Sequence, residues 1–479
     1  MPTSSCEKVG PTRLHPLRTR VLPAVALLVV LAACGDDDAD GASTESSSTT
    51  EAISDSEPAA APDDPGDLDD LDDPEDGASS TTTAAVELTD SFRGVTADTI
   101  KVGVTYMDLE AVGDLIDLDY GDFEATYGAI IDAVNADGGV LGRQLDVEYA
   151  PYFPVGSDSM EEGCNRLTLD EQIFAAMGPL LFEGPLCYTE FNDTILVGPG
   201  QNDERVARSI APWFSSTANL DQLVETVLRG FADEGVYDGA TIAVVGNTAD
   251  QSVLDNVVEP TLEELGVTIA ETALITSALG DSLNGDPEVA LIAERFRSAG
   301  ADTVLALPSG SLQWATGLAL TAYRPVTAFI DLQGVRAYLG DTVGRDETVF
   351  EGSVAGAHNQ WYRWLEDPLI QECVDIVENA TDITIVDPLT AGPDDPDNIV
   401  ALQWACSDIR LFAAIAEAAG PDLTNDTFRA AGESLGRFDI PGFGEGTYTP
   451  DSPDGDPPIY FWTWDSEAGI HVTDDTVFS

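Results

Sequence analysis

The sequence predicts an α/β protein with two similar three-layer lobes, each built on a mostly parallel sheet. Runs of alternating apolar residues, typical of strands, follow one another along the chain with runs of helical period between them. This alternation indicates parallel sheets covered by helices. The runs form two series of similar length, and a chain of 479 residues with 43% hydrophobic content can bury two domain-sized cores.

The first 33 residues have the features of an export signal. Basic residues between Lys8 and Arg20 precede an apolar run at 21–31, which is shorter than the roughly 20 residues that a membrane-spanning helix requires. Leu31-Ala32-Ala33-Cys34 resembles the lipobox of bacterial lipoproteins, in which the Cys is acylated. We predict a signal peptide at 1–33, lipidation of Cys34 and an extracytoplasmic protein held at the outer face of the cytoplasmic membrane. The alternatives are an ordinary secreted protein or a membrane anchor, and the short apolar run disfavours the anchor.

Residues 34–93 are predicted to form a disordered acidic tether. From Gly35 to about Asp90 the sequence has almost no large apolar side chain and neither Lys nor Arg, so it cannot bury enough surface to offset the entropy of ordering. The whole chain has a formal net charge of −67, which disfavours nucleic acid as a partner because phosphate recognition requires basic residues.

The first series opens with a predicted β-α-β unit. Residues 99–105 alternate as a strand, apolar residues recur at helical spacing from Phe123 to Val134, and 144–149 alternate again. Gly138-Gly139 ends the helix. The loop at 106–122 lies at the carboxyl end of the first strand, where open α/β sheets bind ligands.

The same pattern continues to the end of the chain. Further strands are expected at 173–177, 194–197, 241–245, 267–275, 303–307, 327–330 and 352–357. Further helices are expected at 164–172, 186–192, 220–234, 252–265, 287–298, 312–322, 335–339, 368–378, 399–419 and 427–435. The last stretch, 458–472, is predicted to form a hairpin that turns near 466–469 and closes the hinge side.

We assign the series to lobes by their order. The first passage between lobes is placed at the extended segment Trp213–Asn219, and the third, short series beginning at 352 is expected to return to the first lobe. The first lobe is thus predicted to comprise 94–217 and 353–440, and the second 218–352 and 441–479.

Four cysteines remain after Cys6 leaves with the leader and Cys34 takes the lipid. An even number in an exported domain favours disulfides, and proximity in sequence favours pairing Cys164 with Cys187 and Cys373 with Cys406. A four-Cys metal site is the rival interpretation, and the absence of any C-x-x-C pair disfavours it.

Six segments in order resemble the leucine/isoleucine/valine-binding family of type I periplasmic-binding proteins, the receptors of ABC transporters. The matching segments are GVTADTIKVGV from Gly94, VNADGGVLGRQLDVEY from Val134, NRLTLDEQIFAAMGP from Asn165, WFSSTANLDQ from Trp213, RFRSAGADTVLAL from Arg295 and ACSDIRLFAAIAEAAG from Ala405. The resemblance covers the chain from Gly94 onward and also places a disulfide at Cys164 and Cys187.

The resemblance implies a clamp with a hinge crossed three times, whose lobes close over a small ligand in an interlobe cleft. It also implies a monomer with an ABC permease as its membrane partner. Closure stabilises only a ligand that satisfies both lobes. Where family members bind amino acids, a hydroxyl and backbone N–H groups of the first lobe hold the carboxylate, and an acidic side chain of the second lobe takes the ammonium.

Three loops depart from the family pattern and suggest a more apolar or aromatic pocket. Tyr106-Met107-Asp108-Leu109-Glu110 replaces a small glycine-rich stretch, Gly178-Pro179-Leu180-Leu181-Phe182 lacks the family's Ser, and Asn247-Thr248-Ala249-Asp250 lacks the common Tyr-Gly pair. Residues just beyond strand ends are the candidate ligand-binding residues: Tyr106, Leu181, Phe182, Gln201, Ser216, Asn219, Asn247, Ser309 and Asp331.

The most informative pair is Tyr106 as an aromatic wall and Asp331 as the counter-charge for a cationic group. For each candidate, ordinary loop packing is the competing explanation. Asp331 can equally cap the helix that begins near Val335. The polar-aromatic run from His358 to Trp364 can line the mouth of the cleft or dock a partner, and its competing explanation is a packed surface loop.

Other motifs do not support catalysis or a cofactor. Gly432-x-Ser434-x-Gly436 follows a helix, whereas a nucleophile elbow follows a strand, so Gly436 is read as the end of that helix. The glycines at 138–142 end a helix, so they do not form a phosphate loop. The acidic stretch 451–456 lacks the EF-hand spacing. No metal site, cofactor or enzymatic activity is predicted.

The sequence therefore predicts a solute-binding lipoprotein that captures a small molecule, an amino acid or a related amide or aromatic compound, and delivers it to an ABC permease. The alternative is a surface lipoprotein with a ligand-sensing or structural role and no permease.

Overall fold

The computed structural model describes residues 88–109, 120–153, 158–181, 183–277, 287–340, 346–391, 395 and 397–478. They belong to the second of two compact units of the chain, Thr82–Ser479. The predicted signal peptide, Cys34 and most of the predicted tether lie outside the described residues. The tether ends earlier than predicted, because Ser91 and Arg93 already donate hydrogen bonds to main-chain carbonyls of distant segments.

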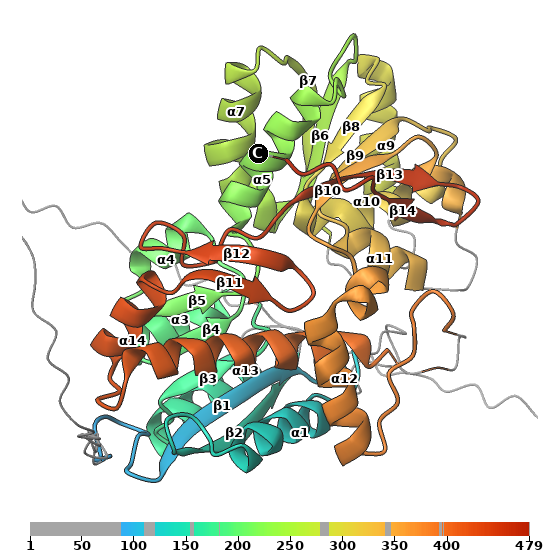
Figure 1. The fold of residues 1–479 in the computed structure, drawn as a ribbon. Coiled ribbons are helices and arrows are strands. Elements are labelled where there is room, and N and C mark those ends of the chain that lie inside the picture. Colours follow the sequence, from blue (N-terminus) through green and yellow to red (C-terminus); the bar gives the residue numbers. More distant parts are fainter. Residues whose placement is uncertain are drawn as a thin grey trace, which may run out of the picture. The chain divides into compact units, whose positions relative to one another are not determined.

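The first lobe is built on a five-stranded parallel sheet with the strand order β2-β1-β3-β4-β5 (Figure 1). The strands are β1 (Thr99–Met107), β2 (Gln144–Tyr152), β3 (Ala175–Met177), β4 (Ile195–Gly198) and β5 (Trp213–Ser215). Residues such as Val102 and Val104 of β1 are fully buried, as expected for a parallel sheet with helices on both faces. The predicted opening β-α-β unit is confirmed.

Helices cover both faces of this sheet. One face packs on α1 (Phe123–Ala136), α12 (Pro368–Ala380), α13 (Ile399–Ala419) and α14 (Asn425–Glu433). The other face packs on α2 (Asp158–Asn165), the π-helical turn η2 (Arg166–Asp170), α3 (Gly184–Leu186) and η3 (Cys187–Phe191), while α4 (Asp203–Arg208) follows β4. Asp122 sets the start of α1, because its side chain accepts the N–H of Ala125.

The second lobe has a seven-stranded sheet with the order β14-β13-β10-β9-β8-β6-β7. The strands are β6 (Ile242–Asn247), β7 (Ile269–Ile275), β8 (Thr303–Ala306), β9 (Val326–Ile330), β10 (Val354–Ala357), β13 (Tyr460–Asp465) and β14 (Ile470–Val472). The first five are parallel to one another, and β13 and β14 add an antiparallel edge. The predicted hairpin at 458–472 is confirmed.

Helices again form a layer on each face of the second sheet. One layer contains α5 (Leu220–Asp233), α6 (Gln251–Val253), η5 (Leu254–Val258) and α7 (Glu259–Glu264). The other contains α9 (Pro287–Ala299), α10 (Ser311–Ala319) and α11 (Gln333–Gly340). Short 3-10 turns are η4 (Thr248–Asp250), η6 (Pro308–Gly310), η7 (Glu347–Phe350) and η8 (Trp361–Glu366). The predicted fold class, two three-layer lobes with mostly parallel sheets, is confirmed.

Two lobe boundaries differ from the prediction. The return to the first lobe is not at 353, because β10 pairs with β9 and therefore completes the second sheet. The first lobe also extends past 440: β11 (Gly436–Ile440) and β12 (Gly444–Tyr448) form a two-stranded hairpin, and Tyr448 is buried in the first core. Strand pattern alone does not reveal which sheet a strand joins.

The chain passes between the lobes three times. The passages follow β5, β10 and β12, at 216–219, 358–360 and 449–459. Hydrogen bonds join the first and third passages: the N–H of Asn219 donates to Asp454 Oδ2, and the N–H of Ser215, just before the first passage, donates to Pro453 O. The hinge is thus a small packed structure in its own right.

Both predicted disulfides are present. Cys164 of α2 is bonded to Cys187 of η3, and Cys373 of α12 is bonded to Cys406 of α13. Each disulfide joins two neighbouring helices, and the two disulfides lie on opposite faces of the first sheet. The competing four-Cys metal site is therefore wrong.

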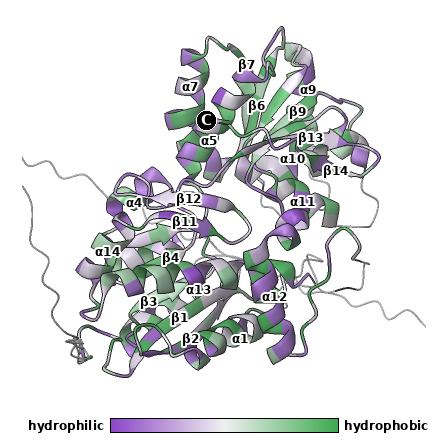
Figure 2. Cartoon of the chain, in the orientation of Figure 1, coloured by the Kyte–Doolittle hydropathy of each residue, from purple (hydrophilic) through white to green (hydrophobic). Residues whose placement is uncertain are grey.

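Among the described residues, α13 is long and apolar enough to cross a membrane by length and composition alone. Most of its surface is buried in the first core, against α1, α12 and α14. Figure 2 shows hydrophobic residues along the interior strands and along parts of this helix. Its apolarity is accounted for by its place at the centre of the lobe.

Candidate functional site

Contacts between the lobes bring together segments that follow the carboxyl ends of strands. Tyr120 lies in the loop after β1, and Arg336 lies on the helix after β9. The Arg336 guanidinium carbon is 5.8 Å from the centroid of the Tyr120 ring. The carboxyl ends of parallel strands are where open α/β sheets bind ligands. The candidate site is therefore the region where these two ends face each other.

Tyr106 lies at the end of β1 and is half-buried. Its ring stacks on Phe123 with the centroids 5.4 Å apart, and its hydroxyl donates a 2.7 Å hydrogen bond to Glu124 Oε1. Burial and this carboxylate raise the pKa of the Tyr106 hydroxyl. The side chain is held by the first helix of its own lobe, which suits a fixed aromatic wall.

Leu181 follows β3 and is half-buried, and its carbonyl accepts the N–H of Gly184. Phe182 lies outside the described residues.

Ser216 and Asn219 lie in the first hinge passage, and Gln201 lies beside it, because its carbonyl accepts the N–H of Leu220. Gln201 is buried and donates through Nε2 to Trp213 O, while its Oε1 has no hydrogen-bond partner in the described part of the chain. The hydroxyl of Ser216 is also buried without a partner there. Asn219 caps α5 through Asp221 N–H and donates through Nδ2 to Asp203. Asn219 therefore has a structural role.

Asn247 and Ser309 come together at the ends of β6 and β8. Asn247 Nδ2 donates to Ser309 O at 2.6 Å, and both residues donate their backbone N–H to the carboxylate of Asp250. Asp250 is 1% exposed, and burial raises its pKa. The sequence reasoning missed Asp250 as the organising group, although Asn247 to Asp250 reads as a capping box.

Asp331 serves its own backbone. It has a left-handed φ of 79°, its N–H donates to Gly356 O, and its carboxylate accepts the N–H of Leu332 at 2.5 Å. Burial raises the pKa of Asp331 to about 6. These bonds favour the helix-start role over that of a free counter-charge. Tyr106 and Asp331 are thus each bonded within their own lobe.

Arg336 is the functional candidate that sequence reasoning did not find. It is 7% exposed, its Nη2 donates to Asp397 Oδ2 at 2.6 Å, and its guanidinium lies 4.9 Å from the centroid of Trp361. The only sequence signal was the polar-aromatic run from His358 to Trp364. This cluster joins residues that are far apart along the chain, so no local pattern reveals it.

His358 lies at the hinge and has a structural role. Its Nε2 accepts the N–H of Ala218, which leaves the proton on Nδ1 to be donated to Pro458 O at 3.2 Å. Burial lowers the pKa of the imidazole to about 4, so the ring is neutral at physiological pH. One side chain therefore ties together all three passages between the lobes.

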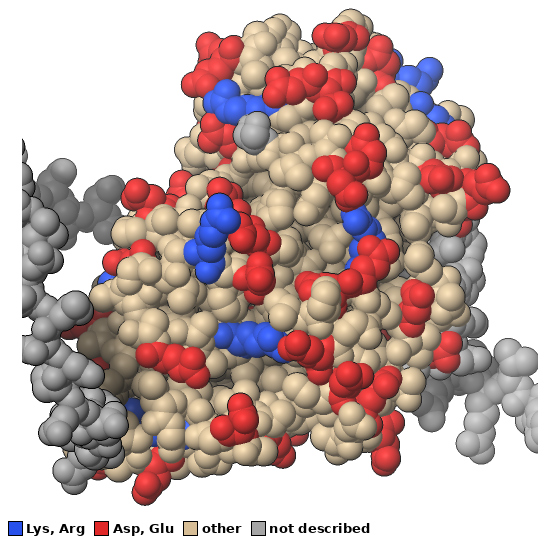
Figure 3. Space-filling model, in the orientation of Figure 1, with Lys and Arg blue, Asp and Glu red and all other residues tan. Residues whose placement is uncertain are grey.

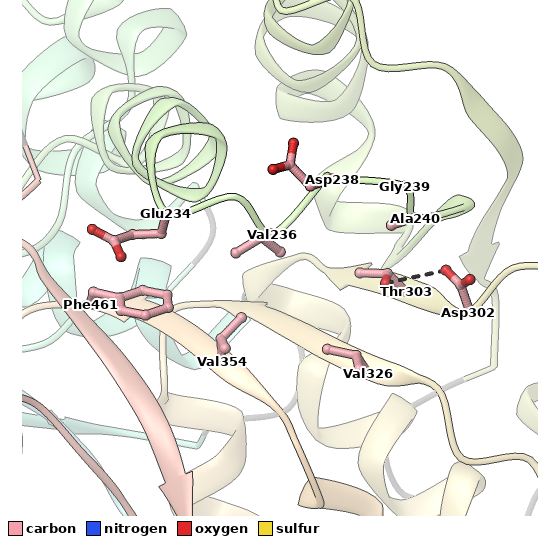
Figure 4. Close-up of a pocket in the computed structure, with 10 residues that line it drawn as sticks. All are labelled: Glu234, Val236, Asp238, Gly239, Ala240, Asp302, Thr303, Val326, Val354 and Phe461. Atoms are coloured by element: carbon pink, nitrogen blue, oxygen red, sulfur yellow. Dashed lines mark hydrogen bonds between the residues drawn. The ribbon is translucent and has the colours of Figure 1, made fainter.

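A depression of about 540 Å³ lies elsewhere, at the amino ends of the strands of the second sheet. Figure 4 shows the carboxylates of Glu234, Asp238 and Asp302 around the apolar side chains of Val236 and Val354. Asp302 accepts the backbone N–H of Thr241, so it serves the start of β6. This depression is at the opposite edge of the sheet from the candidate site.

Acidic side chains are spread over the face drawn in Figure 3, with a few basic side chains among them. Most of the basic residues are paired on the surface, as are Arg205 and Arg208 with Glu183. Arg336 differs because its side chain is almost completely buried in the ion pair that it forms with Asp397.

Comparison with known proteins gives a consistent result. The family model described as periplasmic binding protein matches residues 117–469. No curated protein matches. A substrate-binding protein of an ABC transporter from Desulfitobacterium hafniense, solved with Leu, is 13% identical with a TM-score of 0.54, and the match covers 78% of this chain and 100% of that one.

Two further structures show the same fold. A solute-binding protein from Rhodopseudomonas palustris, solved with p-hydroxybenzoic acid, is 16% identical with a TM-score of 0.56, covering 80% of this chain and 97% of that one. A fatty acid ABC transporter substrate-binding protein from Thermomonospora curvata is 14% identical with a TM-score of 0.56, covering 81% and 94%.

Proposed function

Since the chain belongs to the periplasmic binding protein family, of the leucine/isoleucine/valine-binding type, we propose that it captures a small solute between its lobes and delivers it to an ABC permease. The observation that carries the proposal is the meeting of strand-end segments from both lobes at Arg336, Tyr120 and Trp361. A solute that touches both lobes stabilises their closed arrangement, which is the physical basis of capture.

The aromatic side chains at this position support a ligand with an aromatic or apolar part. Trp361 and Tyr120 lie on segments that follow strand ends and are near Arg336, whereas Tyr106 lies at the end of β1; none of the three is fully buried. The similar proteins were solved with an amino acid or an aromatic acid. We propose an amino acid or a related amide or aromatic compound as the solute.

The direct test is a thermal-shift screen of the full chain against amino acids, amides, aromatic acids and fatty acids. A ligand bound by the folded state alone at 100 times its Kd adds about 2.7 kcal/mol of stability, so the melting temperature rises. We expect at least one class to raise it in a concentration-dependent way. A screen in which no class does so contradicts a solute-binding role.

The proposal includes a lipid anchor at Cys34, which holds the receptor near its permease. Replacing Cys34 by Ser removes the acylated thiol, so the protein should move from the membrane fraction of lysed cells to the soluble fraction. Cys6→Ser is the matched control, because Cys6 lies within the predicted signal peptide. A Cys34→Ser protein that stays in the membrane fraction rules out this anchor.

A further inference from the structure

The candidate site contains one buried cation in a protein with a large excess of acidic residues. Arg143 and Arg336 are the buried arginines among the residues the structure describes, and none of the lysines there is buried. Arg143 donates to the backbone carbonyls of Thr96, Thr89 and Pro421, so it holds the first lobe together. Arg336 instead contacts side chains of other segments: Tyr120, Trp361 and Asp397.

The neighbours of Arg336 come from three separate segments. Tyr120 precedes α1, Trp361 follows the second hinge passage, and Asp397 precedes α13. The guanidinium lies 5.8 Å and 4.9 Å from the two ring centroids, within the range of a cation–π contact. A planar cation between aromatic rings is a recognition element for planar anions, because a guanidinium binds a carboxylate with two parallel N–H donors.

Asp397 already supplies a carboxylate to Arg336. Its Oδ2 accepts from Arg336 Nη2 at 2.6 Å, and this bond joins the second lobe to a segment of the first. The two partners differ in exposure: the Arg336 side chain is 8% exposed, whereas the Asp397 side chain is 35% exposed. Asp397 can therefore turn to solvent at small cost, but Arg336 cannot lose its partner without leaving a buried charge unpaired.

The asymmetry has a chemical consequence. When Asp397 leaves, the buried guanidinium requires another anion, and a neutral or cationic group does not supply one. The neighbouring rings add apolar and aromatic contact area for the body of the same molecule. Asp331, the predicted counter-charge for a cation, is occupied by its own backbone.

We propose that Arg336 is the residue that determines ligand specificity, and that it selects a small carboxylate which replaces Asp397 as its partner. The ligand's apolar or aromatic part then lies against Trp361 and Tyr120. This inference rests on the proposed function and narrows its solute to carboxylates. Asp397 is an internal competitor, which sets a threshold concentration for capture.

The test uses matched carboxylate and amide probes on the full chain: p-hydroxybenzoate with p-hydroxybenzamide, and octanoate with octanamide. Affinities are measured by isothermal titration calorimetry. We expect at least one acid to bind 10-fold or more tightly than its amide. Arg336→Gln should lose this preference, whereas Asp397→Ala should bind the acid several-fold more tightly because the competitor is gone.

The control variant is Arg324→Gln, which removes an Arg–Asp pair of the same 2.6 Å length, with Asp346, inside the second lobe; the Arg324 side chain is 29% exposed. It should leave the affinity for the acid unchanged. Circular dichroism shows whether Arg336→Gln folds. If it does not fold, the change in affinity for the acid caused by Asp397→Ala tests the proposal, because the proposal requires tighter binding. A purely structural ion pair predicts weaker binding in Asp397→Ala.

Two failures can be told apart. If the full chain binds an amide as tightly as its acid, or if only neutral or cationic compounds raise its melting temperature, the carboxylate inference is overturned and the solute-binding role stands. If no compound of any class binds, the proposed function is overturned and the inference with it.

Discussion

His358 joins three segments of the chain with one imidazole ring. The ring can do so only when neutral, because Nε2 must accept from Ala218 while Nδ1 donates to Pro458. Burial keeps its pKa near 4, against 6.5 in the unfolded chain. A histidine in a hinge-side aromatic run is therefore explained by backbone hydrogen bonding rather than by ligand binding.

The pH dependence of stability should carry the signature of His358. Between pH 6.5 and about 4 the unfolded state binds a proton that the folded state does not, so the free energy of unfolding falls as the pH is lowered through this range. We expect the difference between wild type and His358→Gln, measured by urea unfolding, to shrink by about 2 to 3 kcal/mol across it. A difference that does not change with pH contradicts the assignment of a neutral, buried ring.

Gly198 should tolerate no side chain. Its φ is 108°, and a Cβ would lie 2.2 Å from Asp408 Oδ1, a buried carboxyl that accepts from Tyr127 and from Gly178 N–H. Gly239 has a φ of 72° but no atom within 4 Å of such a Cβ. Gly198→Ala should therefore lose about 2 kcal/mol more unfolding free energy than Gly239→Ala, which shares the backbone strain. Equal losses in a urea titration would show that Asp408 moves aside freely.

At the scale of single residues, the sequence predicts positions near strand ends, and the structure adds a local hydrogen-bonding role for several of them. Asn219 and Asp331 lie beyond strand ends and Asn247 is the last residue of β6, and each is hydrogen-bonded to local backbone. Short polar side chains at these places cap helices and turns, and their sequence pattern is the same whether or not they also meet a ligand. Arg336 was missed because its partners are distant in sequence.

At the scale of elements, alternation and helical period predicted most strands and helices of both lobes. The hairpin β11-β12 was missed, since its Gly-rich sequence at 436–448 has a weak apolar pattern. Strand β10 was found but assigned to the wrong lobe. A buried parallel strand has the same sequence pattern in either sheet. Only the pairing of β10 with β9 shows that β10 belongs to the second lobe.

The disulfide between α12 and α13 should stabilise the first lobe. It closes a loop with a sequence separation of 33, for which chain entropy gives about 3 to 4 kcal/mol. We expect the double variant Cys373→Ser, Cys406→Ser to lose about this much unfolding free energy in urea. Adding a reductant to this variant should cost only the contribution of the remaining disulfide. Unchanged stability of the double variant contradicts the prediction.

At the scale of the molecule, the two lobes are joined by a hinge whose three passages are hydrogen-bonded to one another, and they meet again at Arg336. The hinge contacts are made by the protein alone, whereas under our proposal the contact at Arg336 is exchanged for a bound carboxylate. The sequence predicted the two lobes through the two strand-helix series, and the family resemblance added the three passages. Neither the sequence pattern nor the resemblance predicted the contact at Arg336, because its partners come together only when the chain is folded.

The most direct test is hydrogen–deuterium exchange of the full chain with and without the compound that raises its melting temperature most. A solute held between the lobes should slow exchange in segments of both: 106–109 and 120–122 in the first lobe, and 331–336 in the second. The second hinge passage and the residue after it, 358–361, should be protected as well. Residues 234–240, at the opposite edge of the second sheet, should exchange unchanged. Protection confined to one lobe, or found only at 234–240, would contradict capture between the lobes.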